Sequence, residues 1–315
     1  MRRKLIRQGR NALTITLPSS WIKNNNLKSG ETLDIIEKEK KIIIYKISTN
    51  AIAKQFEFEI KTNNPWYIGQ IVRFGFLSNC DQVKIHFKDQ IIFNEILENI
   101  KYLLGYEVIE QGDNYCVIKN LSLELDKEYS NLYRKIFLLT LNMFDLLIQS
   151  CQEDNYSNIA LVDNTNKNIL KFALFCRRVI LKDSDKDSKK NMYNYILLQR
   201  LTMISNNLYY LSRTLFTDKK AIDKKIILPY IMQCKENYNI FYQGLYSKDL
   251  ENILKINEAR KEITEKIEKE MIKNKGKINI ALHYILENIR IIASSGSILL
   301  YLIHDFSLDE NSEFK

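Results

Sequence analysis

The stretch Leu13-Thr14-Ile15-Thr16-Leu17-Pro18 alternates apolar and polar residues and ends at a proline. A period of two with β-branched residues predicts a half-buried strand that stops at Pro18. Around it, the first thirty positions hold seven basic residues and no acidic one. The seven are Arg2, Arg3, Lys4, Arg7, Arg10, Lys23 and Lys28. A strand-patterned segment with such one-sided charge predicts a surface that binds a polyanion.

The residues that follow predict a short helix and then a hairpin. Ser19 or Ser20 can cap a helix that ends at the Asn24–Asn26 run. Strands over 32–36 and 42–45 would flank a tip at 38–41. A segment of about fifty residues cannot bury enough apolar surface to be stable alone. We therefore expect two chains to pair through interleaved hairpins, which would also double the basic surface.

The net charge of +9 is concentrated at this end of the chain. Residues 1–50 hold eleven Lys and Arg against four Asp and Glu, so little of the surplus is left for the remaining residues. A surplus of positive charge confined to one segment indicates an anionic partner, whereas a surplus spread evenly over the chain mainly affects solubility. The length of 315 residues, with 45% hydrophobic and 27% charged residues, fits a globular protein of two or three domains.

Some protein classes are disfavoured by what the sequence lacks. The five cysteines are scattered without a C-x-x-C pair, so we expect small packed thiols in a reducing interior rather than disulfides or zinc. No apolar run approaches the roughly 20 residues of a membrane span and no secretory signal is visible, so we expect a cytoplasmic protein without membrane insertion. Nucleotide-binding loops and common hydrolase motifs are absent, which disfavours an enzyme.

Residues 54–120 predict a small α+β domain. Alternating apolar residues mark strands near 56–60 and 83–87, and a helix fits 65–79 between them. Asp89 can cap a second helix, and a hairpin would close around residues 112–114. The order of the strands does not follow from these patterns.

Residues 127–306 predict helices throughout, because apolar residues recur at steps of three and four. Polar breaks near 153–155, 182–190, 217–225, 247–249 and 274–276 divide the region into six helices. Their spacing suits a bundle of two three-helix halves. The predicted fold class is therefore multidomain α+β, with a β-domain at 1–47, an α+β domain at 54–120, a helical bundle at 127–306 and a tail at 307–315.

Residues 3–36 resemble the SpoVT-AbrB swapped-hairpin DNA-binding domain. The resemblance rests on Arg3-Lys4-Leu5, Gly9, Leu13–Pro18, Trp21 and Leu27-Lys28-Ser29-Gly30-Glu31. The rest of the chain resembles archaeal PhoU-type phosphate uptake regulators, through Leu103-Leu104-Gly105-Tyr106-Glu107-Val108-Ile109-Glu110 and the six predicted helices. These resemblances imply a DNA-binding regulator of phosphate uptake and homeostasis that dimerises through its N-terminal domain.

Two departures from these families concern the sites. PhoU proteins carry an acidic motif in each half, in which Glu and Asp four residues apart on one helix face bind metal. Here Thr202 and Asn206 replace both acids of the first copy, and in the second only Glu287 remains, with Ile291 in the other position. We therefore expect neither a metal nor a cofactor. The DNA-binding family also has a Ser after its Gly, where this chain has Arg10-Asn11-Ala12, so the contact surface differs.

The predicted DNA contacts are Arg2, Arg3, Lys4, Arg7, Arg10 and Lys23. Guanidinium groups suit phosphate oxygens and guanine edges. The expected partners are double-stranded DNA and a second copy of the chain. One alternative, implied by the PhoU resemblance, is a signalling adaptor that docks on a phosphate transporter's ATPase or on a kinase without binding DNA. Another, a metal-dependent enzyme in the bundle, is disfavoured by the lost carboxylates.

Overall fold

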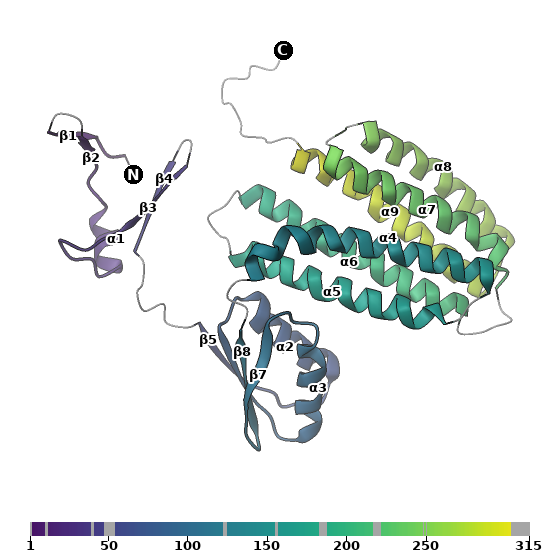
Figure 1. Ribbon diagram of the computed structural model, residues 1–315, viewed down its shortest axis with the longest axis horizontal. Coiled ribbons are helices and arrows are strands. Elements are labelled where there is room, and N and C mark those ends of the chain that lie inside the picture. The colour runs from purple at the N-terminus through teal and green to yellow at the C-terminus, as the bar shows by residue number, and fades with distance from the viewer. Residues whose placement is uncertain are drawn as a thin grey trace, which may run out of the picture. The chain divides into compact units, whose positions relative to one another are not determined.

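The computed structural model describes residues 2–9, 12–38, 41–46, 54–121, 125–154, 157–182, 188–216, 222–247, 249 and 251–303. The chain forms two compact units, Met1–Ala53 and Lys54–Lys315. Each unit is described here by itself (Figure 1). The predicted fold class is confirmed: a small region of β-hairpins is followed by a small α+β part and by a bundle of helices.

The first unit contains two hairpins and one short helix. β1 (Ile6–Gln8) and β2 (Ala12–Thr14) pair antiparallel, and so do β3 (Asp34–Lys38) and β4 (Lys41–Tyr45). The predicted strand over 13–18 is too long, because β2 ends at Thr14, where its pairing with Ile6 ends. Leu13 is 63% exposed rather than half-buried.

Helix α1 (Ser19–Asn24) begins directly after Pro18, and no side chain caps it. The prediction that Ser19 or Ser20 is the cap is therefore wrong. Pro18 has an extended backbone, with φ −62° and ψ 129°, which is the usual conformation of the residue directly before a helix. Both serines consequently lie inside the first helical turn.

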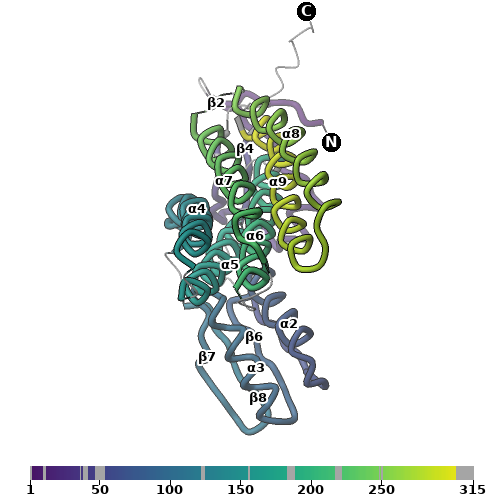
Figure 2. The backbone as a smooth tube through the Cα atoms, turned by 90° about the vertical axis from the view of Figure 1, so that its right-hand side faces the viewer, coloured from purple at the N-terminus to yellow at the C-terminus, as the bar shows by residue number. Residues whose placement is uncertain are grey.

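The α+β part contains a four-stranded sheet in the order β5-β6-β8-β7. Its elements are β5 (Gln55–Glu59), α2 (Pro65–Leu77), β6 (Gln82–His86), α3 (Gln90–Ile100), β7 (Tyr106–Gln111) and β8 (Tyr115–Asn120). β5 and β6 are parallel and are joined through α2, whereas β8 pairs antiparallel with both β6 and β7. Both helices lie beside the sheet (Figures 1 and 2).

Local signals set the helix boundaries in this part. Asn64 caps α2 by accepting a hydrogen bond from the Tyr67 N–H, and Pro65 occupies the first turn. Asp89 caps α3 by accepting from the N–H groups of Ile91 and Ile92, as predicted. Gly75 lets α2 approach the sheet, because a Cβ there would lie 2.6 Å from Cγ2 of Val83.

After a short 3-10 turn at Leu125–Glu128, the described residues form six long helices. They are α4 (Tyr129–Glu153), α5 (Asn158–Lys182), α6 (Ser188–Phe216), α7 (Lys224–Ser247), α8 (Glu251–Lys273) and α9 (Lys277–Ile303). α4, α5 and α6 pack in sequence, as do α7, α8 and α9, and the α6–α9 and α4–α7 contacts join these two groups. The predicted breaks between helices thus lie where the chain turns.

The core of the bundle is apolar. Among its fully buried side chains are Phe137 and Phe144 of α4, Phe175 of α5 and Tyr238 and Phe241 of α7. All five cysteines are free and buried, which confirms that they pack as small apolar residues.

Helix α9 is the most apolar of the bundle helices, although no continuous apolar run in the sequence marks it as a membrane span. Among the described helices, it alone is long and apolar enough to cross a membrane, over Lys277–Leu302, by length and composition. Within that stretch, 56% is buried against the rest of the protein. A helix at the centre of a bundle has the same properties, because it is apolar on most sides.

Candidate nucleic-acid interface

Five of the six predicted DNA-contacting residues lie in three segments of the first unit. Arg2, Arg3 and Lys4 lie in the irregular segment before β1, and Arg7 is the central residue of β1. Lys23 lies in the last turn of α1. All five side chains are exposed.

Arg10, the sixth predicted contact, lies outside the described residues. The pairing of β1 places Arg7 directly opposite Leu13 across the hairpin. Opposed residues of an antiparallel pair project to the same face, so a cation and an exposed apolar side chain share one face of this hairpin.

In the described part of the first unit, one acidic residue is held by a lysine outside the predicted DNA-contacting set. Glu31, the acid nearest to them in the sequence, pairs with Lys46, with Oε2 and Nζ 2.9 Å apart. The hydrogen bond from Lys46 lowers the pKa of Glu31, so its carboxylate stays charged and occupied. Among the described residues, Arg2, Arg3, Lys4 and Lys23 form no ion pair. The segment therefore offers positive charge to a partner outside the chain.

The first unit also exposes large apolar side chains. None of the residues whose burial is described in it is buried. The large side chains that are exposed are Leu5, Ile6, Leu13, Ile15, Ile35, Ile42 and Tyr45. In β3 and β4, Ile35 is 64% and Ile42 66% exposed. A unit this small without a buried core needs another surface to pack on.

Of the four bundle positions that the PhoU resemblance compares with acids, 202, 206 and 291 hold neutral side chains, whereas Glu287 pairs with Arg290, with Oε1 and Nη1 3.1 Å apart. The Thr202 hydroxyl donates to the carbonyl of Gln199 at 2.7 Å, and Ile291 is buried. Asn206 accepts a hydrogen bond from Nδ2 of Asn166 at 3.1 Å. The three neutral side chains have no negative charge to offer a cation.

A second amide pair lies at the α6–α9 contact, where Nδ2 of Asn207 donates to Oδ1 of Asn288 at 2.9 Å. These pairs could not be predicted from the sequence, because each Asn bonds to an Asn on another helix, far away in the sequence. Within the part of the chain that is described, no three His, Cys, Asp or Glu side chains gather as metal ligands would.

Comparison with known proteins gives one match. Residues 6–51 match the family described as antidote-toxin recognition MazE, bacterial antitoxin. No curated protein and no solved structure matches the chain. The match supports a DNA-binding domain of the SpoVT-AbrB type at the N-terminus and says nothing of residues beyond 51. The resemblance of the helices to PhoU stays a prediction, whereas at its N-terminus the chain carries a MazE/AbrB-like domain, consistent with DNA binding and transcription regulation.

Proposed function

We propose that the protein is a transcription regulator that binds double-stranded DNA as a homodimer and takes part in phosphate uptake and homeostasis. It acts in the cytoplasm, has no catalytic activity and needs no metal or cofactor. DNA contact is assigned to Arg2, Arg3, Lys4, Arg7 and Arg10, with Lys23 as a peripheral contact.

The observation that carries the DNA part of this proposal is the exposed cationic segment that leads into the matched region, with Arg7 inside it. Arg2, Arg3, Lys4 and Arg7 lie within six positions, all exposed, and residues 6–51 match the MazE family. Arginine presents a planar fork of donors that fits phosphate oxygens and the guanine edge in the major groove. Three arginines and one lysine within six positions would supply a large share of the electrostatic binding free energy.

Dimerisation is supported by the exposed apolar side chains of the same unit. Ile35 and Ile42 project from the β3–β4 hairpin without cover. A second copy that packs its hairpins on them would bury these side chains and place two cationic segments related by a two-fold axis. Such an arrangement fits a pseudo-palindromic DNA site.

The phosphate part of the proposal is supported only by the resemblance of the helical region to PhoU. Mapping the genomic fragments that the full-length protein binds tests it directly. Fragments from upstream of phosphate transport genes would support this role, and fragments unrelated to phosphate would remove it while leaving DNA binding intact.

The alternative function is a signalling adaptor, in which the bundle docks on a transporter ATPase or a kinase. Binding of the same protein partner by the full-length chain and by a chain without residues 1–50, with no duplex DNA bound by either, would favour this alternative. Binding of duplex DNA by the full-length chain, and not by the chain without residues 1–50, would favour the regulator.

A further inference from the structure

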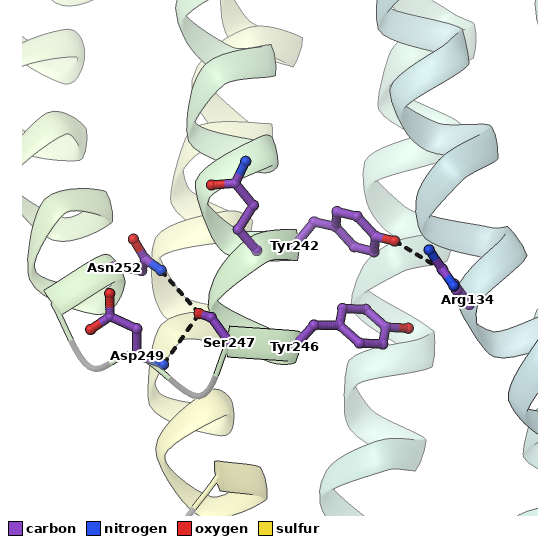
Figure 3. Close-up of a pocket in the computed structure, with 7 residues that line it drawn as sticks. Arg134, Tyr242, Tyr246, Ser247, Asp249 and Asn252 are labelled. Carbon is purple, nitrogen blue, oxygen red and sulfur yellow. Dashed lines mark hydrogen bonds between the residues drawn. The ribbon is translucent and has the colours of Figure 1, made fainter.

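A pocket of about 680 Å³ lies on the bundle where α4, α7 and the start of α8 meet, far in sequence from the cationic segment. It is lined by Arg134, Tyr242, Gln243, Tyr246, Ser247, Asp249 and Asn252. Every one of these side chains carries a polar group, and the volume lies within the range of small-molecule sites. Figure 3 shows Tyr242 and Tyr246 projecting from α7 toward Arg134 of α4.

Arg134 is held in place by two tyrosines of α7. Its Nε donates to the hydroxyl of Tyr242 at 3.3 Å, and its guanidinium carbon lies 5.9 Å from the ring centroid of Tyr246. The two rings support each other edge to face, with centroids 5.1 Å apart. Within the described part of the chain, no carboxylate forms an ion pair with Arg134. A guanidinium oriented this way presents its remaining N–H groups to an oxyanion.

The other end of the pocket has a different chemistry. The Ser247 hydroxyl oxygen accepts from the Asp249 N–H at 3.3 Å and from Nδ2 of Asn252 at 3.4 Å, which leaves its own hydrogen to donate (Figure 3). Oδ1 of Asp249 accepts from the Glu251 N–H at 2.9 Å, so this carboxylate is fixed at the start of α8. Its second oxygen adds a negative acceptor to the pocket wall.

We propose that this pocket binds a small two-ended polar molecule, with a phosphate or carboxylate group on Arg134 and hydroxyl or amino donors toward Asp249. The tyrosine rings would line the middle of the ligand. An oxyanion alone would meet the repulsion of Asp249, and a cation alone that of Arg134. This inference does not depend on DNA binding, because it concerns the bundle only.

Calorimetric titration of the full-length protein with three probes tests the inference. The probes are AMP, which has a phosphate ester with hydroxyl donors, glutamate, which has carboxylates with an ammonium, and inorganic phosphate, which has no second end. We expect AMP or glutamate to bind with a Kd of about 1 mM or tighter and inorganic phosphate more weakly. Binding by AMP alone would identify a phosphate ester, and binding by glutamate alone a carboxylate.

Variants decide whether the pocket is the site. Arg134→Gln should weaken the bound probe about tenfold or more. Arg213→Gln is the matched control, because Arg213 also lies over a tyrosine, Tyr209, at 5.9 Å but does not line the pocket. It should bind like the wild type. Asp249→Asn keeps a residue type that caps helices, so it should weaken glutamate and leave AMP little changed.

Two results would overturn the inference. One is the failure of both AMP and glutamate to bind the wild type. The other is equal binding by the wild type and the Arg134→Gln variant. Because Arg134 is exposed, its loss should leave the fold intact, and circular dichroism of the variant verifies this.

Discussion

Arg178 of α5 lies over the ring of Tyr106 in β7, with its guanidinium carbon 4.7 Å from the ring centroid. The same carbon lies 4.7 Å from the ring centroid of Phe76 in α2, and Nε donates to Oδ1 of Asn79 at 3.2 Å. Arg178 is only 6% exposed, and this burial lowers its pKa. A single buried guanidinium thus joins the α+β part to the bundle.

The first prediction concerns this junction. Arg178→Ala removes a desolvated cation–π contact and a hydrogen bond, so it should lower the free energy of unfolding by about 2–3 kcal/mol. Urea denaturation of the full-length protein measures the loss. Arg213→Ala, which removes an exposed contact with Tyr209, should cost less than about 1 kcal/mol. Equal losses in the two variants would show that the junction contributes no special stability.

The second prediction concerns the amide pair in the bundle. Asn206→Ala leaves Nδ2 of Asn166 without its partner in a nearly buried position, so it should cost about 1–3 kcal/mol. A double-mutant cycle with Asn166→Ala should give a coupling free energy of about 1 kcal/mol. A coupling of zero would mean that the two amides do not support each other.

The third prediction concerns pH. Burial raises the pKa of the Cys116 and Cys176 thiols from about 9 to about 12 and that of Cys151 to about 11. Above pH 9 the unfolded chain therefore loses thiol protons that the folded chain keeps. Each such thiol lowers stability by about 1.4 kcal/mol per pH unit until its folded pKa is reached.

Unfolding in urea at about pH 8 and about pH 10 measures this dependence. The Cys116→Ala variant should show a shallower loss between these two values, since it has one such thiol fewer. A stability that stays constant over this interval, or an equally steep loss in the variant, would contradict the assignment.

The fourth prediction concerns the dimer. Ile35→Thr with Ile42→Thr keeps β-branched side chains in β3 and β4 and removes exposed apolar surface, so the dimer should dissociate. Sedimentation equilibrium measures the mass. Ile272→Thr, on α8 and 83% exposed, is the control and should stay dimeric. A monomeric wild type, or a double variant that remains dimeric, would contradict the proposed dimer interface.

Periodic patterns predicted most of the fold. The step of three and four between apolar residues located all six bundle helices, and the cap at Asp89 located the start of α3. The predicted start of α1 was wrong, because the helix begins directly after the extended backbone of Pro18 and not at a serine cap. The order β5-β6-β8-β7 could not be predicted from the sequence, because strand pairing between distant segments leaves no local pattern.

The candidate sites divide in the same way. The cationic segment could be predicted because its residues lie close together in the sequence, and the exposure of Arg2, Arg3, Lys4 and Arg7 needs no distant partner. Arg134 and Asp249 are over a hundred positions apart, and the packing of α7 against both α4 and α8 brings them to one pocket. The amide pairs and the junction at Arg178 were likewise missed, because each joins residues from different helices or strands.

The fifth prediction concerns individual DNA contacts. Arg7→Ala should weaken duplex binding, since Arg7 lies at the centre of β1 and exposes its side chain. Arg260→Ala, a loss of the same charge from exposed α8, is the matched control and should bind like the wild type. Equal duplex affinities of the two variants would show that Arg7 makes no direct contact with DNA. Fluorescence anisotropy with a labelled duplex measures both.

The salt dependence of duplex binding by the full-length protein tests the central claim most directly. If Arg2, Arg3, Lys4 and Arg7 of two copies each neutralise one phosphate, the logarithm of the association constant should fall with the logarithm of salt concentration with a slope of about −7, at about −0.9 per phosphate. A slope near zero, or no binding of any duplex at low salt, would contradict the account.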